Sequence, residues 1–341
     1  MIHNPQNHPG TPGSDSRPFG YGQPIDAIVL AGTHTNPRRL IAGRNKAFLE
    51  FAEKPLVRHV VDALLDAKTI DHVFVVGPAE TLEQALENSS ARVRVVQQVG
   101  RLLANAWAAI YASEDRHSGE ASAVTRARPL LVISCDLPLI SGMAIDDFVH
   151  RCALEDQASE RPFALMVGVV DEPGVAPFHT SDSGEGIERP FVESAFGRLR
   201  LANLYVSRPR QLAHQEFLQT GFSYRKAKDW RNVFQLALSL FRQHGGFAAA
   251  WLTVRLQLTQ WARKIRPDWY RRMRAGNTRA KLERSTGDVL GGLCRIITTP
   301  YGGLSLDVDD SEDFRILQAR YSDWLEIHHA MDRQCLDQEP E

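Results

Sequence analysis

Ile25–Gly32, with the sequence Ile-Asp-Ala-Ile-Val-Leu-Ala-Gly, is the stretch that decides the fold. Its first six residues form a short run rich in β-branched side chains, which predicts a buried strand. The Ala-Gly pair then ends the strand and opens a loop, where glycine lets a phosphate or a base approach the backbone closely. A tight turn is the commoner explanation of this pair taken alone, so the segment indicates a ligand site only in combination with other residues.

Strands and helices alternate after this first strand. Each predicted strand is a continuous apolar run, which is typical of a mostly parallel sheet covered by helices on both faces. The expected fold class is therefore α/β. Ligands of such sheets bind at the carboxyl ends of the strands, so we expect the chemistry in the loops after Leu30, Val96 and Ser134. The predicted strands are 25–30, 72–78, 93–96, 130–134, 163–170 and 199–206, and the predicted helices are 55–67, 81–88, 102–112 and 144–154.

Residues 209–290 depart from this pattern, because they are helical in periodicity and mix tryptophan and leucine with many arginines. We interpret them as a helical insertion. Strands are predicted again over 294–298 and 304–309, followed by a helix over 311–321. The expected organisation is a disordered leader over 1–23, a core over 24–208, the insertion over 209–290, a return to the core over 291–325 and a C-terminal tail over 326–341.

Composition excludes several classes of protein. The net charge of −1 gives no electrostatic reason for nucleic-acid binding, so no nucleic-acid partner is expected. The four cysteines form no Cys-x-x-Cys pair, which favours free thiols in a reducing compartment. No apolar run approaches the ~20 residues that span a bilayer. Together with the absence of a signal peptide, this predicts a cytoplasmic protein.

Two charged residues follow predicted strands at the expected edge of the sheet. Asp136 comes directly after the strand that ends at Ser134, and its carboxylate is a hard oxygen ligand of the kind that Mg²⁺ prefers. An N-cap or turn aspartate is the alternative. Lys46 lies beyond the first loop, where its ammonium could neutralise charge on a phosphoryl group. Its alternative is a solvated surface lysine.

A late acidic segment, Leu306–Asp313, offers a second carboxylate for the same metal site. Asp307 and Asp309 alternate with apolar residues, so they share one face of the expected strand. Glu312 and Asp313 are expected to cap the helix that follows. In another strand, the buried amide of Asn203 is costly unless it is paired, so we expect it to hold either an acceptor hydroxyl or a neighbouring loop.

These segments, in this order, resemble the nucleotidyltransferase superfamily that includes molybdenum cofactor guanylyltransferase (the MobA-like NTP transferases) and sugar-phosphate nucleotidylyltransferases. The resemblance covers roughly residues 25–208 and 293–322, and the helical segment between them resembles poorly characterised members with a helical insertion. The segments that carry it are Ile28-Val29-Leu30-Ala31-Gly32, Asn45-Lys46-Ala47-Phe48-Leu49, Lys54-Pro55-Leu56-Val57, Cys135-Asp136-Leu137-Pro138-Leu139-Ile140 and Leu306-Asp307-Val308-Asp309-Asp310-Ser311-Glu312-Asp313-Phe314.

The resemblance implies a Rossmann-like sheet of the kind shared with GT-A glycosyltransferases. It implies Mg²⁺ (or Mn²⁺) as cofactor and an NTP as substrate. Asp136 is the implied metal ligand, with Asp307 near the metal and the α-phosphate. Lys46 and Asp136 are the implied catalytic residues. The implied nucleotide-binding residues are Leu30, Ala31, Gly32, Thr33, Arg44, Lys46 and Asn105, and the acceptor-binding residue is Asn203.

Two departures from the family pattern lie in the loop that is expected to bind the phosphates. Thr33 stands where the family usually has a second glycine, and the stretch from Leu30 to Lys46 is longer than the common one. That loop normally wraps the triphosphate, and we expect Arg44, together with Arg38 and Arg39, to take over part of this role.

The predicted activity is transfer of a nucleoside monophosphate from an NTP to a small phosphorylated acceptor. A GT-A glycosyltransferase is one alternative, but its Asp-x-Asp metal motif is replaced here by Asp136-Leu137-Pro138. A non-catalytic nucleotide-binding protein is the other, suggested by Thr33 and the altered loop. A dinucleotide-dependent oxidoreductase is disfavoured, because the Gly-x-Gly-x-x-Gly fingerprint is missing.

The basic helical segment, residues 225–284, has two interpretations. It could be an interfacial amphipathic element that docks on anionic lipid. The interpretation that we favour from sequence is an ordinary helical cap, or a homodimer surface, with a solvated basic face. The sequence identifies neither the base of the NTP nor the acceptor.

Overall fold

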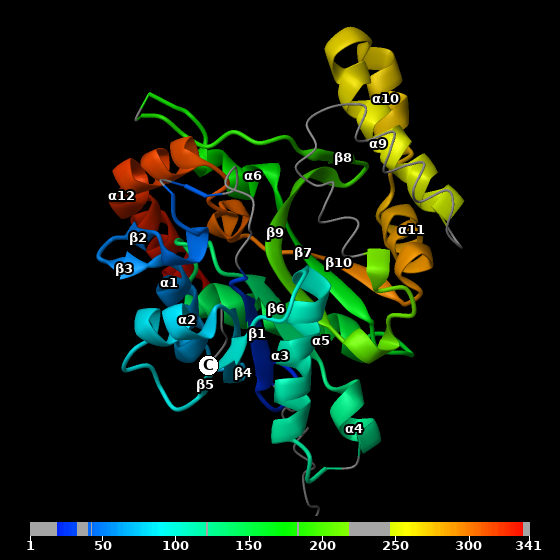
Figure 1. Ribbon diagram of the computed structural model, residues 1–341. Coiled ribbons are helices and arrows are strands. Elements are labelled where there is room, and N and C mark those ends of the chain that lie inside the picture. Colours follow the sequence, from blue (N-terminus) through cyan, green and yellow to red (C-terminus); the bar gives the residue numbers. More distant parts are fainter. Residues whose placement is uncertain are drawn as a thin grey trace, which may run out of the picture.

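A computed structural model of the chain describes residues 19–32, 40–41, 43–120, 122–182, 184–217 and 246–336. A single eight-stranded sheet runs through the middle of this part of the molecule (Figure 1). Strand by strand across the sheet, the order is β10 (Cys294–Thr298), β7 (Leu165–Asp171), β9 (Gly197–Ser207), β6 (Leu130–Ser134), β1 (Ile25–Leu30), β4 (Ile70–Gly77) and β5 (Val93–Gln97), and β8 (Val192–Ser194) pairs with β9.

The sheet is mostly parallel, which confirms the expected α/β class. β1 pairs in parallel with β4 and β6, and β10 pairs in parallel with β7. β9 is the exception, because it runs antiparallel to β6, β7 and β8. From β1 the chain builds outward to β4 and β5 and then returns to place β6 on the other side of β1. The strand order therefore reverses at β1 and β6, whose carboxyl ends form a topological switch point, the usual ligand site of such sheets.

Helices cover both faces of the sheet, which explains why β1 is apolar throughout. Ala27 and Val29 pack on one face with α1 and α5, whereas Ile28 packs on the other face with α3. The helices of the core are α1 (Leu56–Asp66), α2 (Ala79–Ala85), α3 (Leu102–Arg116), α4 (Ser122–Ala127), α5 (Gly142–Gln157), α6 (Glu172–Val175) and α12 (Ser311–Leu336). Short elements are the 3-10 turns η2 (Lys46–Phe48), η3 (Ala176–Phe178), η4 (Pro209–Gln211) and η5 (Gly302–Ser305), and the two-stranded hairpin β2 (Glu50–Phe51) and β3 (Lys54–Pro55).

Three further helices lie within the segment predicted to be helical: α9 (Gly246–Ile265), α10 (Pro267–Ala275) and α11 (Arg279–Leu290). α11 packs along β10, while α9 and α10 contact β8. In Figure 1, α9 and α10 stand out from one corner of the sheet. Residues 218–245 of the same segment lie outside the described residues. In the described part of the chain, no helix is long and apolar enough to cross a bilayer.

The strand predicted over 304–309 is wrong. The chain forms the 3-10 turn η5 over Gly302–Ser305 and then continues without ladder pairing to residue 309. Tertiary packing overrides the local pattern here, because a Cβ at Gly302 would lie 2.0 Å from the carbonyl oxygen of Gly174. Val308 nevertheless donates its backbone N–H to the carbonyl of Asp136, at 3.2 Å. The acidic segment therefore lies beside the end of β6, although not as a strand.

The two ends of the described chain are more ordered than expected. Phe19 stacks on His150 and Tyr21 donates a hydrogen bond to Asp156, so the last residues of the expected leader pack on the core. Residues 1–18 lie outside the described residues. At the other end, α12 continues to Leu336, beyond the helix end expected at Tyr321. The physical reason is burial, since Trp324 and His328 are both fully buried.

α12 closes a second hydrophobic cluster that lies beneath the acidic segment. Ile316, Leu317 and Trp324 of the helix pack there against Leu306 and Val308. The cluster also holds residues that flank the two predicted catalytic positions, namely Ile41, Leu49, Phe51 and Leu139. α12 therefore fixes the backbone segments of Lys46, Asp136 and Asp309 relative to one another.

His328 makes the stability of this cluster depend on pH. Its ring packs among the rings of Phe178 and Tyr301, and neither ring nitrogen has a hydrogen-bond partner in the described residues. Burial lowers the pKa of His328 from 6.5 to about 4. Between pH 6.5 and about 4, His328 is therefore neutral in the folded protein but protonated in the unfolded chain. The stability of the folded state is fully present above pH 6.5 and is lost as the pH falls toward 4.

We expect the loss to approach about 3 kcal/mol of unfolding free energy over that range. Urea unfolding of the wild type and of His328→Leu at several pH values measures it, and the variant should lose this component. His329→Leu, which changes an exposed neighbour, is the control and should keep it. Equal pH dependence in the wild type and His328→Leu would contradict the assignment.

Candidate functional site

Three segments far apart in sequence converge on the ammonium of Lys46. Its Nζ lies 3.2 Å from Oδ2 of Asp136 and 3.2 Å from Oδ1 of Asp309. It also donates to the backbone carbonyl of Val308. The convergence lies at the carboxyl ends of β1 and β6, the switch point of the sheet. The structure therefore brings Lys46 and Asp136 together as a pair.

A capping interaction aims Lys46 at this point. Oδ1 of Asn45 accepts a hydrogen bond from the backbone N–H of Ala47, at 3.1 Å, and so caps the 3-10 turn η2. The other side of the same amide donates to the carbonyl of Gly32, at 3.4 Å. Ala47 is buried beneath the turn. Asn45 thus ties the Lys46 turn to the loop that leaves β1.

Asp136 is held as a buried hydrogen-bond acceptor. It is 6% exposed, and the hydroxyl of Ser134 donates to its Oδ1. Burial by itself would lower the pKa of Lys46, but the carboxylates of Asp136, Asp309 and Asp307 outweigh it and raise that pKa above 10.5. Lys46 is therefore a cation at neutral pH. A buried carboxylate needs such a partner, because an uncompensated buried charge is strongly destabilising.

Arg189 is the functional candidate that sequence reasoning missed. Its guanidinium pairs with Asp309 at 2.5 Å and with Asp313 at 2.6 Å, and it lies 4.0 Å from Asp307. Burial would lower the pKa of Arg189, but Asp307, Asp309 and Asp313 together raise it. Arg189 sits in a Gly- and Pro-rich loop with no periodic pattern, so only the folded chain shows that it joins the acidic segment.

The helix after the acidic segment begins with a capping box. Oδ1 of Asp310 accepts from the N–H groups of Glu312 and Asp313, both at 3.0 Å, and Oδ2 of Asp313 accepts in return from the N–H of Asp310, at 3.2 Å. Asp310 is thus the N-cap, and Asp313 takes the capping role expected of it. Of the two functional candidates, Asp309 contacts Lys46 directly, whereas Asp307 is buried and faces Arg189.

This donor set fits a hard divalent cation. Asp136 and Asp309 both place a carboxylate oxygen on one cationic atom, Nζ of Lys46, so two oxygen ligands already converge on a position of positive charge. Mg²⁺ takes one or two carboxylates from a protein and completes its shell with waters and phosphates. Asp136 and Asp309, with Asp307 adjacent, are the residues that would hold it.

The expected nucleotide side of the site lies around Gly32. A Cβ at Gly32 would come within 3.0 Å of Nδ2 of Asn105, so the residue has to be glycine or its neighbour must shift. Oδ1 of Asn105 accepts from the N–H groups of Val99 and Gly100, at 2.8 and 2.9 Å. Asn105 is buried in the first turns of α3. Its amide thus ties the loop after β5 to the start of α3, and it lies close to the backbone of Gly32.

The other residues expected to bind the nucleotide have different surroundings. The N–H of Ala31 donates to the carbonyl of Val76 at 2.9 Å, so it belongs to the sheet edge. Leu30 is partly buried. Arg44, near the end of the loop that leads to Lys46, is exposed. Thr33, Arg38 and Arg39 lie outside the described residues. The phosphate-binding role of this loop stays a prediction.

Asn203 occupies a special backbone position. Its φ is 52°, in the left-handed region, and it lies where the register between β7 and β9 shifts between Val167 and Val169. Asparagine tolerates this conformation better than most residues. The amide is 5% exposed, at a β-bulge. The bulge gives a structural reason for this residue, and its contact with an acceptor stays a prediction.

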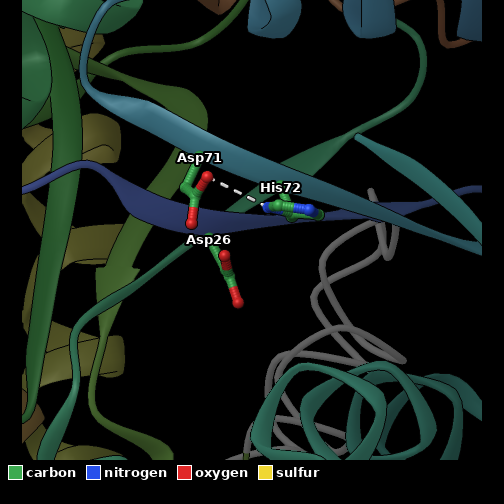
Figure 2. A group of neighbouring side chains, drawn as sticks. All are labelled: Asp26, Asp71 and His72. Atoms are coloured by element: carbon green, nitrogen blue, oxygen red, sulfur yellow. Dashed lines mark ion pairs between the residues drawn. The ribbon is translucent and has the colours of Figure 1, made fainter. Parts of the chain in front are cut away.

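A second group of metal-ligating side chains lies at the opposite edge of the sheet. In Figure 2, Asp26 of β1 lies beside Asp71 and His72 of β4. One possible ligand atom from each of these three residues lies within 4.8 Å of the others. Arg116 already supplies positive charge there, because its guanidinium lies 2.6 Å from Asp71 and 3.7 Å from Asp26. His72 pairs with Asp71 at 3.0 Å. This group is therefore an ion-pair network remote from the switch point.

Comparison with known families gives a match in the first half of the chain. Residues 27–174 match the family described as the MobA-like NTP transferase domain, which confirms the resemblance drawn from sequence. No curated protein shows significant similarity to the chain.

Among solved structures, a hypothetical transferase from Thermus thermophilus matches with a TM-score of 0.56 and 22% identity, over 85% of this chain and 99% of that one. This likeness shows a shared fold. The 4-diphosphocytidyl-2C-methyl-D-erythritol synthase of Anaerococcus prevotii matches with a TM-score of 0.45 and 11% identity, over 90% of this chain and 100% of that one. A CMP:2-keto-3-deoxy-manno-octonic acid synthetase complexed with CTP matches with a TM-score of 0.43 and 12% identity, over 88% and 99% of the two chains.

Substitutions of Asn105 separate its structural role from nucleotide binding. Asn105→Ala removes the acceptor for two backbone N–H groups and should lower the unfolding free energy by about 1–3 kcal/mol. Asn105→Asp keeps an acceptor oxygen but replaces the donor beside Gly32 with negative charge. If the amide faces the nucleotide, we expect the aspartate variant to melt near the wild-type temperature yet bind NTP at least about tenfold more weakly. Wild-type NTP affinity in Asn105→Asp would remove this residue from the site.

Proposed function

We propose that this chain, whose residues 27–174 carry a MobA-like NTP transferase domain, moves a nucleoside monophosphate from an NTP to a small phosphorylated acceptor and releases pyrophosphate. The observation that carries the proposal is the convergence of Lys46, Asp136 and Asp309 at the switch point of the sheet. One cation and two carboxylates at that edge are the groups that phosphoryl chemistry requires.

The protein has to align the NTP with the acceptor and to offset their negative charge. An oxygen of the acceptor's phosphate, or of a hydroxyl, attacks the α-phosphorus, and the bond to pyrophosphate breaks. Both reactants are anions, so the site must hold them in line and offset their charge. Lys46, which stays protonated because of its three carboxylate neighbours, offsets the negative charge of the phosphates. Mg²⁺ or Mn²⁺ held by Asp136 and Asp309, or Asp307, would supply further charge neutralisation when bound.

The acceptor side of the proposed site is a cavity of about 710 Å³ that begins at Arg189. Because Arg189 also pairs with Asp309, the cavity adjoins the Lys46 cluster. One wall comes from the core and the other from α9. The lining residues are Glu172, His179, Glu188, Arg189, Pro190, Phe191, Glu193, Arg198, Gln260 and Arg263.

The wall formed by α9 is fixed by one buried carboxylate. Glu193 is 2% exposed, and it pairs with Arg198 at 3.2 Å and with Arg263 at 3.4 Å. Tyr270 of α10 donates to the same carboxylate at 2.6 Å. The amide of Gln260 donates to the carbonyl of Phe191 at 3.0 Å. The side chains that α9 contributes are therefore positioned before any acceptor arrives.

The chemistry of the cavity suits a hydroxyl-rich body. Its three arginines and three glutamates balance in formal charge, so the lining offers both donors and acceptors. Burial and the charge of Arg200 lower the pKa of His179, and Nε2 of this neutral ring is buried with no hydrogen-bond partner in the described residues. A sugar or polyol monophosphate would place hydroxyls on these groups and its phosphate toward Arg189.

The first measurement of this function is thermal stability with each NTP, with and without Mg²⁺. A ligand that binds only the folded state raises the melting temperature. We expect a Mg²⁺-dependent rise with one NTP, and we expect Asp136→Asn to lose that rise together with at least about 100-fold of the transfer rate. Lys46→Met should also lose transfer.

Asp71→Asn changes a carboxylate of the remote network and should leave transfer unchanged. A rise with a sugar nucleotide alone would favour glycosyl transfer, and NTP binding without pyrophosphate release would favour a non-catalytic protein. Full transfer activity in Asp136→Asn would contradict the role of Asp136 as a metal ligand.

Variants of α9 test the acceptor cavity. Gln260→Leu and Arg263→Leu remove polar groups from its wall, so we expect the KM for a sugar or polyol monophosphate to rise about tenfold, while the KM for NTP stays unchanged. Arg271→Leu, at a position of α10 that does not line the cavity, is the matched control. The measurement is pyrophosphate release at varied acceptor and fixed NTP. An equal rise in both KM values would place the cavity outside the acceptor site.

A further inference from the structure

The outer side of α9 and α10 carries large apolar side chains in contact with water. Trp251, Trp261 and Trp269 are 57%, 54% and 55% exposed, and Leu258 is 42% exposed. Three of the five tryptophans in the described part of the chain therefore lie on this pair of helices. Other exposed large apolar residues of the described chain are distributed over separate elements. A concentration of this kind marks an interaction surface.

Helix geometry gathers the residues of α9 on one side. Trp251, Leu258 and Trp261 are spaced by seven and three residues, which places them within an arc of about 80°. α10 follows after Arg266, whose guanidinium lies 5.7 Å from the ring of Trp269. In Figure 1 both helices project from the corner of the sheet.

The same two helices are strongly basic. Between Gly246 and Ala275 the sequence holds six arginines and one lysine against a single acidic residue, Asp268, whereas the whole chain has a net charge of −1. Arg266 lies over the ring of Trp269, and Arg271 and Arg272 are exposed on the same helix, where Arg271 also pairs with Asp268. Arg255, Arg263 and Arg274 contact the protein itself, so the exposed positive charge of this pair of helices comes from Arg266, Arg271 and Arg272.

We propose that α9 and α10 dock this protein on an anionic lipid bilayer. Tryptophan rings occupy the interface between headgroups and acyl chains, and arginines attract the headgroup phosphates. Charge complementarity selects this occupant. A symmetric contact with a second copy would oppose two cationic patches, which repel each other. This inference is independent of the nucleotidyl-transfer reaction.

Docking in this way leaves the proposed acceptor cavity open. Gln260 lies about 160° around α9 from Leu258, and about 100° from Trp261, at 100° per residue. Gln260 and Arg263 therefore face the cavity from a different side of the helix than the exposed apolar residues. One helix thus presents one surface to the bilayer and another to the cavity.

Sedimentation with vesicles tests the proposal on the full chain. We expect the protein to sediment with vesicles of phosphatidylcholine and phosphatidylglycerol at low ionic strength, and not with phosphatidylcholine alone. Binding should fall steeply at about 1 M salt, where the Debye length is about 3 Å. The combined Trp251→Ser, Trp261→Ser and Trp269→Ser variant should bind at least about tenfold more weakly.

The control replaces equally exposed apolar residues elsewhere, Tyr111→Ser with Val124→Ser, and should bind as the wild type does. A blue shift of wild-type tryptophan fluorescence on adding anionic vesicles provides a readout that needs no variant. No sedimentation with anionic vesicles, or unchanged binding by a folded triple-tryptophan variant, would overturn the proposal. So would a concentration-dependent dimer in the ultracentrifuge that the triple variant abolishes, because the patch would then bind a second copy.

Discussion

The ion pairs of Lys46 with Asp136 and Asp309 are the constraint on which the rest of this structure depends. Asp136 is nearly buried at the end of a central strand, and a buried carboxylate without a cation is strongly destabilising. Two such groups would also repel each other. The ammonium of Lys46 neutralises the buried carboxylate and reduces the repulsion between the two carboxylates. Three separate segments of the fold, around Lys46, Asp136 and Asp309, meet at this position. The proposed site is therefore shaped before a nucleotide binds.

Apolar packing makes that electrostatic arrangement stable. Leu306 and Val308 are buried next to the acidic residues with which they alternate, and α12 covers them with Leu317 and Trp324. The cluster lies outside the main core, yet it includes residues on both sides of Lys46 in the sequence. A helix at the end of the chain thus determines the geometry of residues near its beginning. The proposed site requires the return of the chain after residue 290 as well as residues 27–174.

Sequence alone predicted the scaffold better than the wall of the site. Strong apolar runs such as Ile25–Leu30 and Leu130–Ser134 identified the central strands, because their local pattern agrees with their burial on both faces. Lys46 could be picked out from its place beyond the first loop and Asp136 from its place directly after a strand, and their catalytic roles stay predictions. The conformation of the segment 304–309 could not be predicted in this way, since contact between Gly302 and Gly174 decides it. Arg189 and Glu193 escaped notice because most of their partners are distant in sequence, and no periodicity marks such residues.

The buried carboxylate of Glu193 has a consequence for how this protein could diversify. It connects the proposed acceptor cavity to α9 and α10 through Arg263 and Tyr270, while Lys46 and Asp136 lie within the separate segment 27–174. The parts that would grip the nucleotide and the parts that would choose the acceptor are thus encoded in different stretches of the gene. Changes in the helical stretch can accumulate without disturbing the charged centre, provided that one carboxylate keeps its partners.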